Sequence, residues 1–136
     1  MFRYNTSSLD TNVILRLLVE DNPAQVKKAL NLLSDESHSF LVEDVAVMEA
    51  VHTLETYYKK SREEIVDLLE SLFSAPNILY SSLEVFEKTY PLYLKYPMLS
   101  FNDCYLAVKS EAASAEPLWT FDKLLAKKLP SAKEII

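Results

Sequence analysis

Short apolar runs alternate with longer amphipathic stretches along the whole chain. The short runs, such as residues 40–42 and 78–80, have the length and the side chains of strands, and the longer stretches repeat apolar residues at helical spacing. The pattern predicts helices over residues 11–19, 23–35, 44–58, 62–74, 82–95, 102 or 103 to 115, and 123–129. It predicts strands over residues 1–9, 40–42, 78–80, 118–121 and 135–136.

Capping residues and prolines mark several ends of these helices. Pro23 suits the first turn of the second helix, where a missing backbone N–H costs nothing. Ser61 and Glu64 have the spacing of a capping box at the start of the fourth helix. Pro91 is expected to kink or split the fifth helix, because proline cannot donate the backbone hydrogen bond there.

The order of these elements predicts the fold class. Strands that alternate with helices form parallel sheets covered on both faces. We therefore expect an α/β protein, a three-layer sandwich with a short parallel sheet of four to five strands and helices on both faces. The 136 residues suit a single domain over residues 1–136.

Four carboxylates directly adjoin or interrupt apolar runs, namely Asp10, Glu49, Asp103 and Asp122. A buried carboxylate without a partner is very costly, and four acids at one point would repel each other. A divalent cation such as Mg²⁺ is the simplest group that holds them together. Asp10 and Asp122 follow predicted strands, at the sheet edge where parallel sheets bind ligands. The first hypothesis is therefore a metal-dependent phosphodiesterase.

Each acid also has a purely structural interpretation. Asp10 and Asp122 could cap the helices that follow them, and Asp103 could complement a helix dipole from the first turn. Glu49 is harder to explain in this way, because it lies in the middle of a predicted buried helix with no nearby cation in the sequence. A salt bridge from Glu49 to a distant lysine or arginine stays open.

Composition removes several classes of protein. The chain has no glycine, which excludes the glycine-rich phosphate loops of P-loop and Rossmann proteins. A single cysteine, Cys104, excludes an internal disulfide framework. No apolar stretch reaches membrane-spanning length and no signal peptide is recognisable, so we expect a cytoplasmic protein without a membrane partner. The net charge of −6 favours a basic protein partner, and a bound metal would still permit nucleic acid at the acidic site.

The motifs around these acids resemble those of a known family. The stretch from Leu9 to Leu18 resembles the opening motif of PIN-domain ribonucleases, especially VapC-like toxins. Asn102-Asp103 followed by Leu106-Ala107 resembles the third acidic motif of that family, and Thr120-Phe121-Asp122-Lys123 resembles the last one. Glu49 falls where the family places a helical glutamate. The resemblance extends over essentially the whole chain.

The resemblance implies a PIN-like fold and an endoribonuclease that depends on Mg²⁺ or Mn²⁺. It implies that Asp10, Glu49, Asp103 and Asp122 are the metal ligands and catalytic residues. Asn12 and Thr120 would be supporting polar residues that orient the ligands or a water molecule. It further implies a homodimer that acts on RNA and, for the toxin branch, is inhibited by a cognate antitoxin protein.

Three alternatives remain at this stage. A non-catalytic PIN module in RNA processing or scaffolding would have the same fold with an inactive site. A receiver-like phospho-acceptor domain also has acids at strand ends, but it needs adjacent acids after an early strand and a lysine after a late one. A flap-type DNA nuclease is disfavoured by the short chain.

Overall fold

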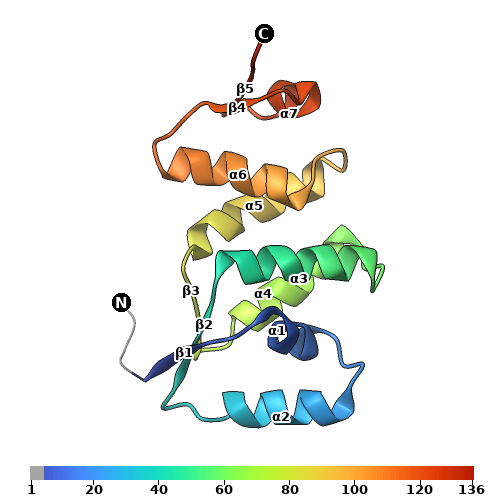
Figure 1. Ribbon diagram of the computed structural model, residues 1–136, viewed down its shortest axis with the longest axis vertical. Coiled ribbons are helices and arrows are strands. Elements are labelled where there is room, and N and C mark those ends of the chain that lie inside the picture. The colour runs from blue at the N-terminus through green and yellow to red at the C-terminus, as the bar shows by residue number, and fades with distance from the viewer. Residues whose placement is uncertain (1–4) are drawn as a thin grey trace. The chain divides into compact units, whose positions relative to one another are not determined.

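The computed structural model describes residues 5–136, which form seven helices and five strands (Figure 1). These residues fall into two compact units that meet in sequence between Ser81 and Ser82, and each unit is described here by itself. Every strand pairs with its neighbours in parallel, and helices separate the strands along the chain. The prediction of a parallel α/β protein is therefore confirmed.

The first unit contains three strands and four helices. In chain order they are β1 (Thr6–Ser8), α1 (Thr11–Leu18), α2 (Pro23–Leu33), β2 (Ser39–Val42), α3 (Asp44–Thr56), α4 (Arg62–Phe73) and β3 (Ile78–Tyr80). The strand order is β1-β2-β3, so β2 is central. Its residues are buried or half-buried on both faces of the sheet, as expected of a covered central strand.

Local sequence signals determine where these helices begin. Pro23 occupies the first turn of α2, and the side chain of the preceding Asn22 accepts a hydrogen bond from the backbone of Gln25 at 3.2 Å. The capping box predicted from Ser61 and Glu64 is present at the start of α4. Both helix starts therefore agree with the sequence prediction.

The core of the first unit lies where α1 packs against α3 and α4 (Figure 1). Ile14, Leu54, Ile65 and Leu69 are completely inaccessible to solvent. They are the apolar positions that repeat at helical spacing in the sequence, and burying each of them contributes about 1.5–3 kcal/mol. This packing fixes α1, which follows Asp10, relative to α3, which carries Glu49.

The second unit contains α5 (Leu83–Lys95), α6 (Phe101–Ala112), β4 (Leu118–Thr120), α7 (Lys123–Lys128) and β5 (Ala132–Glu134). Strands β4 and β5 pair in parallel. The core includes Leu99, Cys104, Ala107, Leu125 and Leu129. Cys104 is buried within this core and forms no disulfide.

Several expectations need correction. The last strand is β5 at Ala132–Glu134, so the strand predicted at residues 135–136 was wrong by a few positions. Pro91 lies inside α5 without splitting it. The five strands divide into a three-stranded sheet and a two-stranded sheet, one in each unit, where a single sheet was expected. Of the first predicted strand, residues 1–4 lie outside the described part of the chain.

No helix within residues 5–136 combines the length and the apolar character that crossing a membrane requires.

Candidate active site

Asp10 lies where β1 ends and α1 begins. The Leu9 backbone N–H donates to the Leu41 carbonyl at 3.0 Å, which continues the pairing of β1 and β2 up to this point. Asp10 is the N-cap of α1, and its Oδ1 accepts from the Val13 backbone N–H at 3.0 Å. Asp10 is exposed, and its Oδ2 has no hydrogen bond to any residue in the described chain. Asp10 thus caps the helix with one oxygen and keeps the other available.

Glu49 lies in the second turn of α3 and is exposed. The expectation that Glu49 lies in the buried first half of this helix was wrong, because both Glu49 and Val45 are exposed. The Glu49 Oε1 accepts a hydrogen bond of 2.7 Å from the Thr11 hydroxyl. Since Thr11 directly follows Asp10, this bond brings the first two acids to the same end of the α1–α3 contact.

Asp103 is the third residue of α6 and is half-buried. It forms a capping box with Ser100, because the Ser100 hydroxyl accepts from the Asp103 backbone N–H at 3.0 Å and the Asp103 Oδ2 accepts from the Ser100 backbone N–H at 3.2 Å. The helix therefore begins at Phe101, whereas the predicted start was residue 102 or 103. The Oδ1 of Asp103 has no hydrogen bond within residues 5–136.

Asp122 follows β4 and is the N-cap of α7. Its Oδ1 accepts from the backbone N–H groups of Leu124 at 2.9 Å and Leu125 at 3.1 Å. The Thr120 hydroxyl accepts from the Asp122 backbone N–H at 2.9 Å. Thr120 therefore fixes the backbone at Asp122, while the Oδ2 of Asp122 makes no hydrogen bond to the described chain.

The four acids fall into two pairs by unit. Asp10 and Glu49 belong to the first unit, and Asp103 and Asp122 belong to the second. Among the described residues, no group of three or more His, Cys, Asp or Glu side chains is placed to hold a metal ion. All four side chains reach solvent, so the cost of burying unpaired carboxylates does not apply.

The donor set nevertheless suits a hard divalent cation. Mg²⁺ and Mn²⁺ prefer carboxylate oxygens. Asp10, Asp103 and Asp122 each use one carboxylate oxygen to cap a helix, and Glu49 uses one to accept from Thr11. Each acid leaves its other oxygen without a partner in the described chain. An oxygen fixed in this way is oriented for a ligand without rearrangement.

A groove runs beside Asp10 along α1 and α2. We call it the Asp10 groove; its volume is about 330 Å³, and it is lined by Asp10, Asn12, Val13, Arg16, Gln25, Lys28, Ala29 and Leu32. Asn12 is exposed on α1 next to the candidate ligand. The groove combines an apolar wall with two cationic side chains, which suits a partner that is both apolar and charged.

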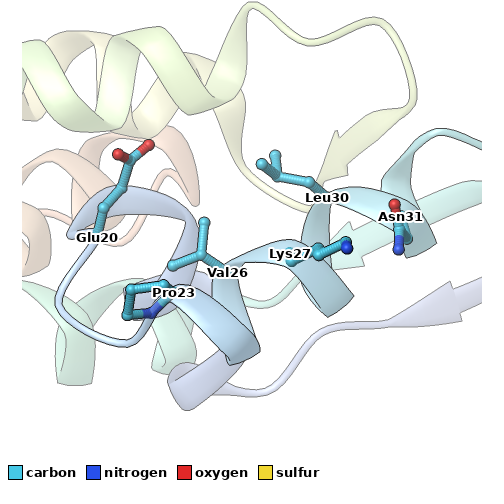
Figure 2. Close-up of a pocket in the computed structure, with 6 residues that line it drawn as sticks. All are labelled: Glu20, Pro23, Val26, Lys27, Leu30 and Asn31. Atoms are coloured by element: carbon cyan, nitrogen blue, oxygen red, sulfur yellow. The ribbon is translucent and has the colours of Figure 1, made fainter.

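A second groove lies along α2, and Figure 2 shows its side chains from Pro23 to Asn31 with Glu20 on the preceding turn. We call it the Pro23 groove; its volume is about 390 Å³, and it is lined by Glu20, Pro23, Val26, Lys27, Leu30 and Asn31. None of the four candidate acids lines it.

A polar cluster joins the C-terminal half of α1 to Tyr58, the second residue after α3. Arg16 forms an ion pair with Asp21 at 3.2 Å and donates to the Tyr58 hydroxyl at 2.9 Å. The Tyr58 hydroxyl donates to Asp21 at 2.6 Å, and this bond raises the pKa of Tyr58. The cluster holds α1 in place at the opposite end from Asp10.

Comparison with known proteins adds three findings. The family model of the PIN domain matches residues 8–128. A search of curated proteins found no match. The chain is similar to a protein chain in a solved structure described as the crystal structure of VapBC2 from Rickettsia felis bound to a DNA fragment from the VapBC2 promoter. The TM-score is 0.40 and the sequence identity is 16%, and the match covers 96% of this chain and 97% of that chain.

Proposed function

The chain belongs to the PIN-domain family, and we propose on this premise that it is a Mg²⁺- or Mn²⁺-dependent endoribonuclease, the toxin of a toxin–antitoxin pair in the cytoplasm. The observation that carries the proposal is the pairing of Asp10 and Glu49. Thr11 joins these two acids at the carboxyl end of the parallel sheet in the first unit, and each keeps one oxygen without a partner in the described chain.

We assign all four acids, Asp10, Glu49, Asp103 and Asp122, as metal ligands and catalytic residues. The matched family region, residues 8–128, includes all four, which supports a single PIN domain over residues 1–136. Thr120 acts as a supporting residue because it holds the backbone at Asp122. Asn12 supports the site from the Asp10 groove.

The chemistry follows from oriented oxygens. Mg²⁺, when bound, lowers the pKa of a bound water and neutralises charge on the phosphate oxygens. The contribution of the chain is to fix the carboxylates in position. Asp10 and Asp122 are fixed by the helix N-termini that they cap, and Asp103 is fixed by its capping box. Rigid carboxylates need little reorganisation during the reaction, which favours hydrolysis of an RNA phosphodiester.

The toxin assignment requires a partner that silences the site. The net charge of −6 favours a basic antitoxin, and an arginine or lysine of that partner could neutralise the carboxylates in place of the metal. The Asp10 groove offers the antitoxin an apolar wall directly beside Asp10. We expect the free protein to be a homodimer, which light scattering of the purified protein would measure.

The test is cleavage of total cellular RNA by purified protein that is free of antitoxin. Mg²⁺ is compared with EDTA, and the wild type with Asp10→Asn and Asp103→Asn. Both variants keep the size of the side chain and remove its charge, so we expect folded proteins that have lost cleavage. Asp67→Asn is the matched control, because Asp67 is an exposed acid on α4 that is not among the candidate ligands.

Discrete cuts that require metal, Asp10 and Asp103 would support the proposal. Full cleavage by both variants would rule out this assignment of the site. Absence of cleavage by the wild type with either metal would favour the alternative, a non-catalytic PIN module.

A further inference from the structure

Thr11 is the first residue of α1 and directly follows Asp10. Its hydroxyl donates a hydrogen bond of 2.7 Å to the Oε1 of Glu49, a residue 38 positions later in the sequence. The bond is short and charge-assisted, which makes it one of the stronger kinds of hydrogen bond in proteins. It is therefore a specific contact between the first and second acidic motifs.

The Glu49 carboxylate has no other restraint in the described chain. Thr53 donates to the Glu49 backbone carbonyl at 3.0 Å and leaves the carboxylate untouched. No cation within residues 5–136 pairs with Glu49. An exposed glutamate samples many rotamers, and fixing it costs side-chain entropy. Thr11 thus holds the carboxylate in one of the conformations that it could adopt.

The geometry points to a role for this contact, and we propose that Thr11 is a positioning residue that holds the Glu49 carboxylate beside Asp10 for a divalent cation. The inference rests on the proposed metal site. In this role Thr11 acts through Glu49, because its hydroxyl proton is directed at Oε1. The bond leaves Oε2 and one lone pair of Oε1 for the cation.

A purely structural role of the bond makes a different prediction. If Thr11 only ties α1 to α3, removing its hydroxyl should lower stability and leave the affinity for metal unchanged. If Thr11 orients Glu49, the affinity should fall with little change in stability, because the helices are already held by buried apolar side chains such as Ile14 and Leu54. Metal affinity therefore separates the two roles.

The experiment measures Mn²⁺ binding to the full chain by calorimetry or by electron paramagnetic resonance of the free ion, without RNA. Thr11→Val keeps the shape of the side chain and removes the hydroxyl, whereas Thr11→Ser keeps the hydroxyl. We expect Thr11→Val to weaken Mn²⁺ binding roughly tenfold, as is typical when a residue that orients a metal ligand is removed. We expect Thr11→Ser to restore the affinity of the wild type.

A second pair of variants tests whether Thr11 acts through Glu49. Glu49→Gln should itself weaken Mn²⁺ binding, and adding Thr11→Val to it should then cause no further loss. Thermal melts of all the variants check that they are folded. An additional loss in the double variant would overturn the proposal, because Thr11 would then act without Glu49.

The remaining outcomes separate the two proposals. Wild-type binding that depends on Glu49 but not on Thr11 would overturn the positioning role alone. A wild type that binds no Mn²⁺ would overturn the metal site and the positioning role with it.

Discussion

At the scale of single residues, the Tyr58 hydroxyl joins two charged side chains. It donates to Asp21 at 2.6 Å and accepts from Arg16 at 2.9 Å. Tyr58→Phe removes both bonds while keeping the ring, so we expect the free energy of unfolding at neutral pH to fall by about 1–2 kcal/mol. Urea denaturation followed by circular dichroism measures the change. Tyr57→Phe is the control, because the Tyr57 side chain is 75% exposed. The stability of this variant should therefore match that of the wild type.

The same bond makes the contribution of Tyr58 depend on pH. The hydrogen bond to Asp21 stabilises the protonated phenol and raises its pKa. The stabilisation is therefore fully present below the ordinary tyrosine range and is lost as the pH rises through the raised pKa. An ultraviolet titration of the protein, which has eight tyrosines, should lose one step above the ordinary tyrosine range in Tyr58→Phe. A titration that is unchanged above that range would contradict this assignment.

The candidate ligands were found from sequence by their position beside apolar runs, but the reason first given for them was wrong. Asp10, Glu49 and Asp122 are exposed and Asp103 is half-buried, so burial does not force a cation on them. A carboxylate beside an apolar run can still face solvent when it lies at a helix start or on an outer helix face. Thr11 was not singled out, because its bond to Glu49 depends on how two helices pack.

At the scale of elements, the capping box of α4 is open to a direct test. The Glu64 backbone N–H donates to the Ser61 hydroxyl at 3.1 Å, and the Ser61 backbone N–H donates to the Glu64 carboxylate at 2.9 Å. We expect Ser61→Ala to lower the free energy of unfolding by about 1 kcal/mol. Chemical denaturation measures this loss, and RNA cleavage by the variant should remain that of the wild type. A loss of cleavage in a folded variant would contradict the separation of this cap from the site.

The glutamate of this box adds a dependence on pH. Its hydrogen bonds to Ser61 hold the pKa of Glu64 below the usual range. The ionised form is the one that stabilises the helix, so its contribution is present above the ordinary glutamate range and is lost as the pH falls through the lowered pKa. The difference in stability between the wild type and Glu64→Gln should accordingly shrink in acid.

Helices were easier to predict than strands for a physical reason. A helix has internal signals, namely apolar spacing, Pro23 at a first turn and the box at Ser61, and these signals agreed with the structure. A strand of three residues depends on its partner. Strand β1 is polar and lies at the edge of its sheet, and β5 pairs with β4 through Ala132–Glu134 where the more apolar residues 135–136 were expected. The sequence of so short a strand therefore does not predict which residues will pair.

At the scale of the whole molecule, charge and grooves together indicate how a partner would bind. The chain carries a net charge of −6, which favours a basic partner and would make the affinity of the complex fall as salt increases. Yet the Asp10 groove has the cations Arg16 and Lys28 on its wall as well as apolar side chains. We therefore expect net charge to guide the encounter with the proposed antitoxin, and apolar contact within a groove to decide where it is held.

The two grooves along α2 allow this location to be tested with matched variants. Leu32 lines the Asp10 groove and is 49% exposed, and Leu30 lines the Pro23 groove and is 54% exposed. Because both leucines lie on one helix and are similarly exposed, replacing either with glutamate should affect stability alike. We expect Leu32→Glu to weaken the complex with the proposed antitoxin about tenfold or more, since a charge would replace an apolar contact that the complex buries.

Leu30→Glu should leave that complex unchanged, and calorimetric titration of the purified antitoxin into each variant measures the difference. Free Leu32→Glu should still cleave RNA, because Leu32 is not one of the residues proposed to hold the metal. If Leu30→Glu weakens the complex and Leu32→Glu does not, the partner occupies the Pro23 groove. The antitoxin would then have to inhibit the enzyme without covering Asp10 directly, because none of the candidate acids lines that groove.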